Sequence, residues 1–325
     1  MCGIVGYVGP DEALPIVLEG LRRLEYRGYD SAGVAVLADG LTVRKRAGKL
    51  AELEAALAAE PIAGGTTAMG HTRWATHGAP TDDNAHPHLD CSGRVAVIHN
   101  GIVENHRELR LSLEKDGHAF ASETDTEVVA HLVEAALDGE PDLTAAVRSV
   151  LGRLDGAFSL VVLSAAHPGE MVGVKVSSPM VVGLGTGETI LASDIPAVLE
   201  RTRSVVPLEE GQIATIWADG VSITTLEGEL VDVEPITVDW DVTAAQKSGY
   251  DWFMRKEIDE QPDAIRDTLV GRTHAGRLQL DELRIPDDVL REVSKVFVVA
   301  CGTAFHSGLV AKYAIEHWTR LPVEI

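Results

Sequence analysis

Cysteine is scarce in this sequence: Cys2, Cys91 and Cys301 are the only three among 325 residues. So small, odd and scattered a set cannot build the disulfide framework on which small secreted domains depend. The sequence also lacks any apolar run close to the roughly 20 residues that a membrane span requires. Met1 is not followed by the basic and apolar segments of a secretory signal. We therefore expect a cytoplasmic protein without a membrane partner, in which a cysteine is free for chemistry.

Positive charge is in short supply as well. The chain has 28 Lys and Arg residues against 50 Asp and Glu residues, which gives a formal net charge of -22. The average field of such a chain repels nucleic acid phosphates and anionic lipids. We expect no nucleic acid partner and a small-molecule substrate.

The first two thirds of the chain read as an α+β domain. Short apolar runs between Gly- or Asp-containing turns predict strands at 4–9, 32–37, 41–45, 67–70, 94–99, 157–163, 171–176, 180–184, 189–192, 212–218 and 221–225. Helical spacing follows at 11–26, and Asn105 and Thr124 each precede a helical pattern with a glutamate three residues on. Tight turns favour antiparallel pairing, so we expect stacked sheets with helices outside, over residues 2–225.

The remaining third is organised differently. Residues 227–241 are acidic and suit a linker or an arm crossing the surface, and 250–271 have helical spacing that is broken or kinked near Pro262. Together, 226–283 read as a linker with connecting helices. The apolar run 295–300, a glycine turn, a helical pattern at 309–318 and a last apolar run at 321–325 predict the start of a parallel α/β unit. Because a parallel sheet needs several such units, we expect 284–325 to be an incomplete second domain.

The cysteine behind the initiator methionine is a candidate nucleophile. If Met1 is removed, Cys2 carries a thiol and a free α-amine, whose ordinary pKa is about 7.7–8.0. The amine, directly or through a water, can accept the thiol proton and later hand it to a leaving group. The alternative is that Cys2 is a small apolar residue at the head of a strand.

A histidine-rich stretch, HTRWATHGAPTDDNAHPH at 71–88, has little periodicity and suggests a site loop. Zinc binding is a weak alternative there, because no H-x-x-x-H helix or cysteine pair accompanies these histidines, and we expect no metal. Arg73 suits a bidentate clamp on a carboxylate.

Two further positions are ambiguous. The strand ending in HNGIVEN predicts a turn at Asn100-Gly101, where the Gly101 N–H and the Asn100 amide can aim at one point as an oxyanion hole does. An ordinary Asn-Gly turn is the alternative. Asp125 can hold a ligand or can simply satisfy the free N–H groups of a helix start.

Taken together, the motifs resemble those of a family. MCGIVGYVG, LRRLEYRGYDSAG, HTRWATHG, NAHPH, HNGIVENH and SETDTE occur in an order that resembles glutamine amidotransferases of the N-terminal-nucleophile class. Within that class, EIDEQPDAI at 257–265 and VVACGTAFHSG at 298–308 resemble the connector and first sugar isomerase (SIS) segment of the enzymes that aminate fructose 6-phosphate.

The resemblance implies an α+β fold, a four-layer α/β/β/α sandwich, and a reaction without a cofactor. Cys2 would attack the side-chain amide of L-glutamine and form a γ-glutamyl thioester, with Asn100 and Gly101 stabilising the oxyanion. The glutamine carboxylate would bind Arg73 beside Thr76 and His77, and its ammonium group would bind Asp125. Trp74 would gate an ammonia channel, and Arg27 lies in a motif near the glutamine pocket.

For the second domain, the resemblance implies that Gly302 and Thr303 contact the sugar phosphate at a helix N-terminus. Ala304 lacks a hydroxyl that some relatives have. The complete enzymes deliver ammonia to fructose 6-phosphate, giving glucosamine 6-phosphate and glutamate, and dimerise through their isomerase half. The alternatives are another amidotransferase of the class, whose expected second domain CGTAFHSG does not fit, and a noncatalytic sugar-phosphate-sensing module in which Met1 blocks Cys2.

Overall fold

The computed structural model describes residues 2–239, 250, 252–269, 273–274, 277–278 and 285–325. It divides into two compact units, Met1–Ser248 and Gly249–Ile325. Among the described residues, no helix is both long and apolar enough to cross a membrane.

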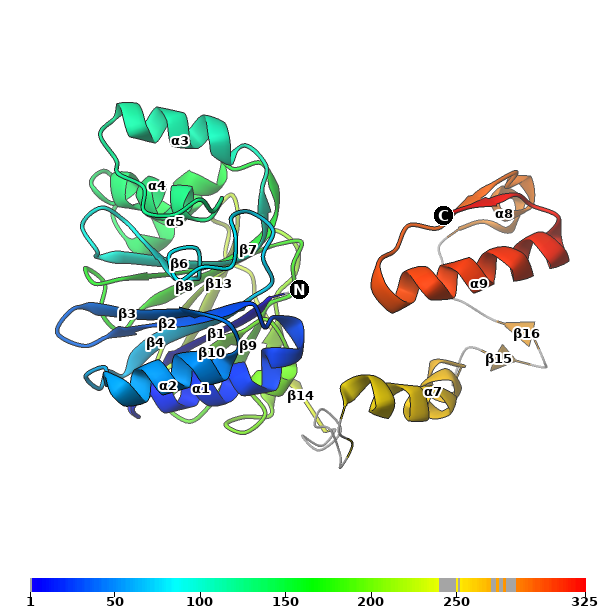
Figure 1. The fold of residues 1–325 in the computed structure, drawn as a ribbon, viewed down its shortest axis with the longest axis horizontal. Coiled ribbons are helices and arrows are strands. Elements are labelled where there is room, and N and C mark those ends of the chain that lie inside the picture. The colour runs from blue at the N-terminus through cyan, green and yellow to red at the C-terminus, as the bar shows by residue number, and fades with distance from the viewer. Residues whose placement is uncertain (1, 240–249, 251, 270–272, 275–276, 279–284) are drawn as a thin grey trace. The chain divides into compact units, whose positions relative to one another are not determined.

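Two antiparallel sheets form the middle of the first unit (Figure 1). The larger sheet has the order β14-β11-β9-β10-β1-β4-β2-β3. Its strands are β1 (Gly3–Val8), β2 (Ser31–Leu37), β3 (Leu41–Ala47), β4 (Thr67–Arg73), β9 (Val181–Leu184), β10 (Thr189–Ala192), β11 (Ser204–Pro207) and β14 (Ile236–Thr237). The smaller sheet has the order β13-β12-β8-β7-β6-β5. Its strands are β5 (His88–Leu89), β6 (Val95–Val103), β7 (Gly156–Ser164), β8 (Met171–Val176), β12 (Gln212–Trp217) and β13 (Gly220–Thr225).

Helices cover the outer face of each sheet (Figure 1). The larger sheet is covered by α1 (Ala13–Leu24) and α2 (Leu50–Ala59), with short 3-10 turns at η1 (Glu25–Arg27) and η2 (Ile195–Ala197). The smaller sheet is covered by α3 (His106–Lys115), α4 (Glu127–Leu137) and α5 (Leu143–Leu151). The order of layers is helix, sheet, sheet, helix, which confirms the predicted four-layer α/β/β/α sandwich.

Strands buried on both faces explain why the apolar runs in the sequence are nearly continuous. In β1, the side chains of Val5 and Tyr7 pack under the helices, whereas those of Ile4 and Val8 pack between the two sheets. Because successive strand residues point to opposite faces, one short run serves two cores. This arrangement fixes the start of β1, and with it Cys2, between two packed layers.

The predicted turn at Asn100-Gly101 is wrong. Strand β6 continues to Val103, and Asn100 and Gly101 pair with Ser159 and Phe158 of β7. Gly101 has φ +123°, and a Cβ there would lie 2.1 Å from the Ala157 carbonyl oxygen. The glycine that suggested a turn is required instead by a close strand contact in the left-handed φ region.

Neither predicted cap residue caps its helix with its side chain, although α3 does begin directly after Asn105 as predicted. Asn105 precedes α3, but its side chain bonds Arg153 and Asp155 of a neighbouring loop. Helix α4 begins at Glu127, later than the Thr124 signal indicates, and has no side-chain cap. Neighbouring groups form hydrogen bonds with these polar side chains, which are then not available to cap the helices. A side-chain cap that the motif search missed lies at Asp142, which accepts a 2.7 Å hydrogen bond from the Ala145 N–H.

The acidic segment after β13 packs on the first unit up to residue 239. Its strand β14 pairs with β11, and Val231 N–H donates to the Ile223 carbonyl. The end of this prediction, 240–241, lies outside the described residues. The predicted domain boundaries, 2–225, 226–283 and 284–325, stay predictions.

The second unit contains one parallel β-α-β unit. The elements of the second unit are α7 (Phe253–Leu269), β15 (Thr273–His274), β16 (Arg277–Leu278), α8 (Asp287–Glu292), β17 (Val296–Phe297), α9 (Gly302–Thr319) and β18 (Val323–Glu324). The β-α-β unit consists of β17, α9 and β18. Helix α7 runs through Pro262, and residues 251 and 270–271 of the predicted helical stretch lie outside the described residues. Strands β17 and β18 are parallel, as predicted. Helix α9 begins at Gly302, so the predicted glycine turn forms its first turns. The described residues do not make up a complete sugar isomerase domain.

Candidate active site

A cavity of about 240 Å³ opens next to the start of β1, the end of β4 and the residues that directly precede α4. Most of the predicted glutamine-site residues line it, although they come from four separate parts of the sequence. The lining residues are Cys2, Arg27, Arg73, Trp74, Thr76, His86, His99, Asn100, Gly101, Ile102, Asp125, Thr126, Ser178 and Pro179.

Cys2 is a free, half-buried thiol directly before β1. Its Sγ accepts a hydrogen bond from the Trp74 N–H at 3.2 Å. Burial raises the pKa of the thiol, while the Trp74 backbone hydrogen bond and the positive charge of Arg73 oppose that rise. The environment therefore keeps Cys2 protonated until a base accepts its proton.

The loop that follows β4 is held by a side chain that the sequence analysis did not single out. The Asp30 carboxylate accepts hydrogen bonds from the Ala75 N–H and the Ser31 hydroxyl, and the Asp30 N–H donates to the Arg73 carbonyl. The Trp74 N–H is thereby fixed against Cys2. Asp30 lies in the motif YRGYDSAG, which was the available signal.

Arg73 ends β4 and is 4% exposed. Its guanidinium donates to the backbone carbonyls of His77, Gly78 (3.2 Å) and Ala79 (3.4 Å). No carboxylate forms an ion pair with it in the part of the chain that the structure describes. Burial lowers the pKa of Arg73, and the negative charges of Asp30 and Asp125 oppose that shift. A buried cation held only by carbonyls is suited to an anionic ligand.

Asp125 supplies the opposite charge. It is 3% exposed and accepts a 2.8 Å hydrogen bond from the Val103 N–H of β6, rather than from α4. The helix-start interpretation of Asp125 is therefore not what the structure shows. The ring nitrogens of His77 and His99 lie 3.9 Å from its oxygens. The cavity thus has a cation and a carboxylate among its lining groups, an arrangement that matches the two ends of an amino acid.

Asn100 is oriented by a buried histidine. His71 Nε2 lies 3.0 Å from the Asn100 Oδ1, and Asn100 Nδ2 donates to the Cys2 carbonyl at 3.0 Å. Burial lowers the pKa of His71 to about 3, so its ring is neutral at physiological pH. A neutral ring with its hydrogen on Nε2 can donate to Oδ1, which turns the amide nitrogen of Asn100 toward Cys2.

Four buried histidines pack together at the wall of the cavity, and two of them, His86 and His99, line it. The rings of His71 and His86 stack with centroids 4.2 Å apart, and His86 lies edge to face with His88 at 4.8 Å. His86 Nδ1 accepts the His99 N–H, which leaves its Nε2 to donate to the Thr126 hydroxyl 3.2 Å away. Burial lowers the pKa of all four rings. These are neutral core histidines.

The other predicted residues lie in different places. Thr76 lines the cavity, whereas His77 is not among the lining residues and lies beside Asp125. Trp74 is 50% exposed at the rim, where its ring meets Tyr29 edge to face. Arg27 lines the cavity and forms a 2.5 Å ion pair with Asp194.

Gly302 and Thr303 belong to the second unit. They are exposed at the N-terminus of α9, where Gly302 has φ +59°. Ile102, Thr126, Ser178 and Pro179 line the cavity of the first unit without having been predicted. Ile102, in HNGIVENH, and Thr126, in SETDTE, lie in motifs, whereas Ser178 and Pro179 do not.

The fold and the site define a class of protein. Residues 71–200 match the family model described as glutamine amidotransferase domain. A solved structure, the glutamine phosphoribosylpyrophosphate amidotransferase from B. subtilis complexed with ADP and GMP, aligns with a TM-score of 0.60 and 27% identity over 69% of this chain and 49% of that chain. The chain therefore contains a glutamine amidotransferase domain of the N-terminal-nucleophile type.

The whole chain is related to a narrower group. It is 59% identical over its full length to a glutamine–fructose-6-phosphate aminotransferase [isomerizing] of Streptomyces coelicolor, of which it covers 53%. It is 55% identical to the protein of the same name from Mycobacterium tuberculosis, of which it covers 54%. The chain thus spans about half the length of these curated relatives.

Proposed function

We propose that the first unit hydrolyses L-glutamine to glutamate and ammonia through a thioester at Cys2. The observation that carries this proposal is the meeting of Cys2, Arg73, Asn100 and Asp125 in one cavity of about 240 Å³. That volume lies below the roughly 300–1,000 Å³ typical of pockets for drug-sized ligands, as suits a single amino acid.

The charges of the cavity support glutamine as the ligand. Arg73 would bind the α-carboxylate in place of the carbonyls that it now contacts, and Asp125 would bind the α-ammonium. Thr76 and His77 lie beside these two groups. Trp74, exposed at the rim, would gate the passage of ammonia. Arg27 is engaged with Asp194 and would act on the shape of the pocket.

The proposed reaction requires removal of Met1. The Cys2 thiol then transfers its proton to its own α-amine, and the sulfur attacks the side-chain carbonyl of glutamine. The C–N bond breaks, the amine returns a proton to the leaving ammonia, and a γ-glutamyl thioester remains. Water attacks the thioester, releases glutamate and restores the thiol.

The β6 strand supports an oxyanion site at Asn100 and Gly101. The His99 N–H donates to His86 and the Val103 N–H donates to Asp125, both on the side of β6 that faces away from β7. Because N–H directions alternate along a strand, the Gly101 N–H lies on that same side, which borders the cavity. With the Asn100 amide it would provide two donors to the oxyanion.

For the second unit, the whole-length likeness supports a place in amination of fructose 6-phosphate, giving glucosamine 6-phosphate and glutamate. Gly302 and Thr303, at the start of the 18-residue helix α9, would contact the sugar phosphate. The complete enzyme would dimerise through its isomerase half.

The test combines intact mass, labelling and turnover. The purified chain should lack Met1, take up one equivalent of a γ-electrophilic glutamine analogue at Cys2, and release ammonia from glutamine with or without fructose 6-phosphate. Cys2→Ala should abolish both labelling and turnover, whereas Cys301→Ala should keep both. Retention of Met1 with labelling only at Cys91 or Cys301 would contradict the proposal and favour the sugar-phosphate-sensing module.

A further inference from the structure

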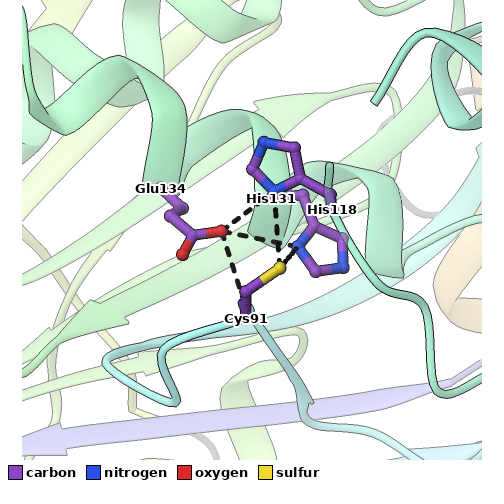
Figure 2. A group of neighbouring side chains, drawn as sticks. All are labelled: Cys91, His118, His131 and Glu134. Carbon is purple, nitrogen blue, oxygen red and sulfur yellow. Dashed lines mark hydrogen bonds and ion pairs between the residues drawn. The ribbon is translucent and has the colours of Figure 1, made fainter. Parts of the chain in front are cut away.

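Four side chains outside the glutamine cavity converge on one point (Figure 2). They are Cys91, from the turn between β5 and β6; His118, just after α3; and His131 and Glu134, both on α4. One donor atom from each lies within 4.8 Å of all the others. This group is called the Cys91 cluster below.

The spacing of these atoms matches a tetrahedral zinc site. With Zn–S of about 2.3 Å and Zn–N and Zn–O of about 2.0–2.1 Å, a tetrahedral ion places sulfur about 3.6 Å from nitrogen and nitrogen about 3.3 Å from oxygen. Cys91 Sγ lies 3.5 Å from His118 Nδ1 and 3.4 Å from His131 Nδ1. Glu134 Oε2 lies 3.1 Å and 3.5 Å from the same two nitrogens.

Local backbone structure sets each donor in place. The Asp90 carboxylate accepts the N–H groups of Ser92, Arg94 and Val95, which closes the turn that carries Cys91. Gly117, with φ +98°, ends α3 in a Schellman motif, in which the His118 N–H donates to the Leu113 carbonyl.

On α4 the two remaining donors are three residues apart. His131 and Glu134 therefore lie on one face of the helix, one turn from each other. Three segments distant in the sequence thus present fixed donors to one point.

A carboxylate lies near the second ring nitrogen of the most buried donor, and that nitrogen has no hydrogen-bond partner among the described residues. His131 is 1% exposed, and its second ring nitrogen, Nε2, lies 3.7 Å from Glu127 Oε1. Glu127 is itself fixed by the N–H groups of Ala121 and Ser122 at 2.7 Å. A carboxylate behind the free nitrogen of a ligating histidine is the usual outer shell of a metal site.

Hydrogen bonding alone accounts less well for the cluster. Each Nδ1 lies close to both the sulfur and Glu134 Oε2 but can form only one well-directed hydrogen bond, as donor or as acceptor of the thiol hydrogen, and Glu134 Oε2 also accepts the Cys91 N–H at 3.3 Å. A cation at the centre is bound by all four groups at once. A thiolate and a carboxylate also balance the two charges of a divalent ion.

We propose that Cys91, His118, His131 and Glu134 bind one Zn²⁺ as a structural site. One thiolate and two imidazoles exclude Mg²⁺ and Ca²⁺, which prefer oxygen ligands. Four protein ligands fill a tetrahedral shell, so this ion stabilises structure rather than activating water. This site replaces the expectation of no metal, and it does not use the histidines of 71–88.

The ion would join three parts of the outer layer. It ties the end of α3 and the β5–β6 turn to α4, whose entry carries Asp125 and Thr126 at the glutamine cavity. The inference does not depend on the proposed glutaminase reaction, because it concerns metal content and stability.

The test measures metal in the full chain. After purification with Zn²⁺ and gel filtration, the wild-type chain should retain one equivalent by elemental mass spectrometry. Its thermal midpoint should rise by about 5–10 °C over the chelated protein, as for a ligand well above its dissociation constant. With Co²⁺ in place of Zn²⁺, a thiolate-to-cobalt charge-transfer band with strong tetrahedral d–d absorption should appear.

Matched variants assign the signal. Cys91→Ser should abolish the charge-transfer band, and His118→Gln should weaken zinc binding by more than the roughly 10- to 100-fold that loss of an outer partner costs. Cys301→Ser, Cys2→Ser and His167→Gln should keep one equivalent. Circular dichroism of the chelated variants checks that they fold. Failure of the wild-type chain to retain zinc, or equal retention by Cys91→Ser and His118→Gln, would overturn the proposal.

Discussion

Two groups of histidines lie close together along the chain but in different surroundings. His71, His86, His88 and His99 lie in the core at the wall of the proposed glutamine cavity, where each is 5% exposed or less. The Cys91 cluster lies between α4 and the loops that carry Cys91 and His118; its His131 is buried and its Cys91 is exposed. Strand β5 separates the two groups, with His88 within it and Cys91 two residues beyond its end.

The difference teaches what decides the role of a histidine. The core rings stack on one another and bond hydroxyls, amides and backbone groups, so burial keeps them neutral and they act by orienting their neighbours. The rings of the cluster meet a thiol and a carboxylate instead, and a cation satisfies that set. Partners, rather than sequence spacing, separate a positioning histidine from a metal ligand.

The largest effect that tests this comparison is expected at His71. His71→Leu removes the donor to Asn100 Oδ1, so the amide can rotate away from the oxyanion. Glutaminase kcat should fall about 10²-fold, as when one oxyanion donor is lost, with little change in KM. Steady-state ammonia release measures both constants.

His71→Gln serves as the conservative variant, because its amide N–H can still donate, and it should recover much of the lost kcat. Zinc content should be the same in both variants. Equal activity of His71→Leu and wild type would show that the core ring is only a space-filling group.

The next effect concerns the charges of the cavity. If the core histidines are neutral, recognition of the α-ammonium falls to Asp125. Asp125→Asn keeps an acceptor for the Val103 N–H but loses the charge, so KM for glutamine should rise about 10- to 100-fold, as for one charge-assisted hydrogen bond. Glutamine titration of the rate measures this, with the thermal midpoint as the check on folding. A variant that unfolds without altered glutamine use would favour a structural role.

Acid stability should distinguish the core histidines from the cluster. Burial lowers the pKa of His71 from its ordinary 6.5 to about 3. Between these pH values the unfolded chain binds a proton that the folded chain does not, so stability is full above pH 6.5 and is lost as pH falls toward 3. Each such ring should lower the free energy of unfolding by up to about 1.4 kcal/mol per pH unit.

Urea unfolding of the chelated protein from pH 7.5 to pH 5 measures this slope. His71→Gln removes one titrating group and should make the slope shallower. An unchanged slope in that variant would mean that His71 does not contribute to the acid sensitivity.

The smallest effect is expected at Gly117. A Cβ at Gly117 meets nothing within 4 Å, so Gly117→Ala creates no steric clash. The substitution should lower the free energy of unfolding only through the strain of an alanine in the left-handed backbone conformation, by about 1 kcal/mol or somewhat more. The thermal midpoint should fall by about 2–4 °C per kcal/mol, and zinc binding should weaken because His118 follows directly. Gly169→Ala is the matched control, with φ +78° and equally open space. Its midpoint should also fall, but its zinc binding should not change.

Much of the fold could be predicted from local pattern. Strands β8 and β10 have the predicted ends, because a continuous apolar run and the turns on either side mark both limits. Helix α2 was missed although its Ala, Leu and Glu residues favour a helix, since its outer face is also alanine-rich and shows little contrast.

The candidate site was predictable only in part. Cys2, Arg73 and Asp125 belong to motifs, whereas the β6 strand through Gly101 depends on its pairing with β7, which no local pattern contains. The Cys91 cluster shows why such sites have no local pattern. His131 and Glu134 have an H-x-x-E spacing, but Cys91 is 40 residues from His131 and is brought next to it only by the fold.

Strand β6 has a further consequence. Its neighbour β5 pairs with Ala96 and Val97, and within the described part of the chain no strand lies beside the far half of that side. Unpaired strand edges invite foreign strands and aggregation when they are accessible. Here His86 and Asp125 occupy two of the open N–H groups, and a bound amino acid would cover the one at Gly101. The substrate would complete the hydrogen bonding of this strand edge while it is bound. The enzyme with substrate bound would therefore be better protected from self-association than the empty enzyme.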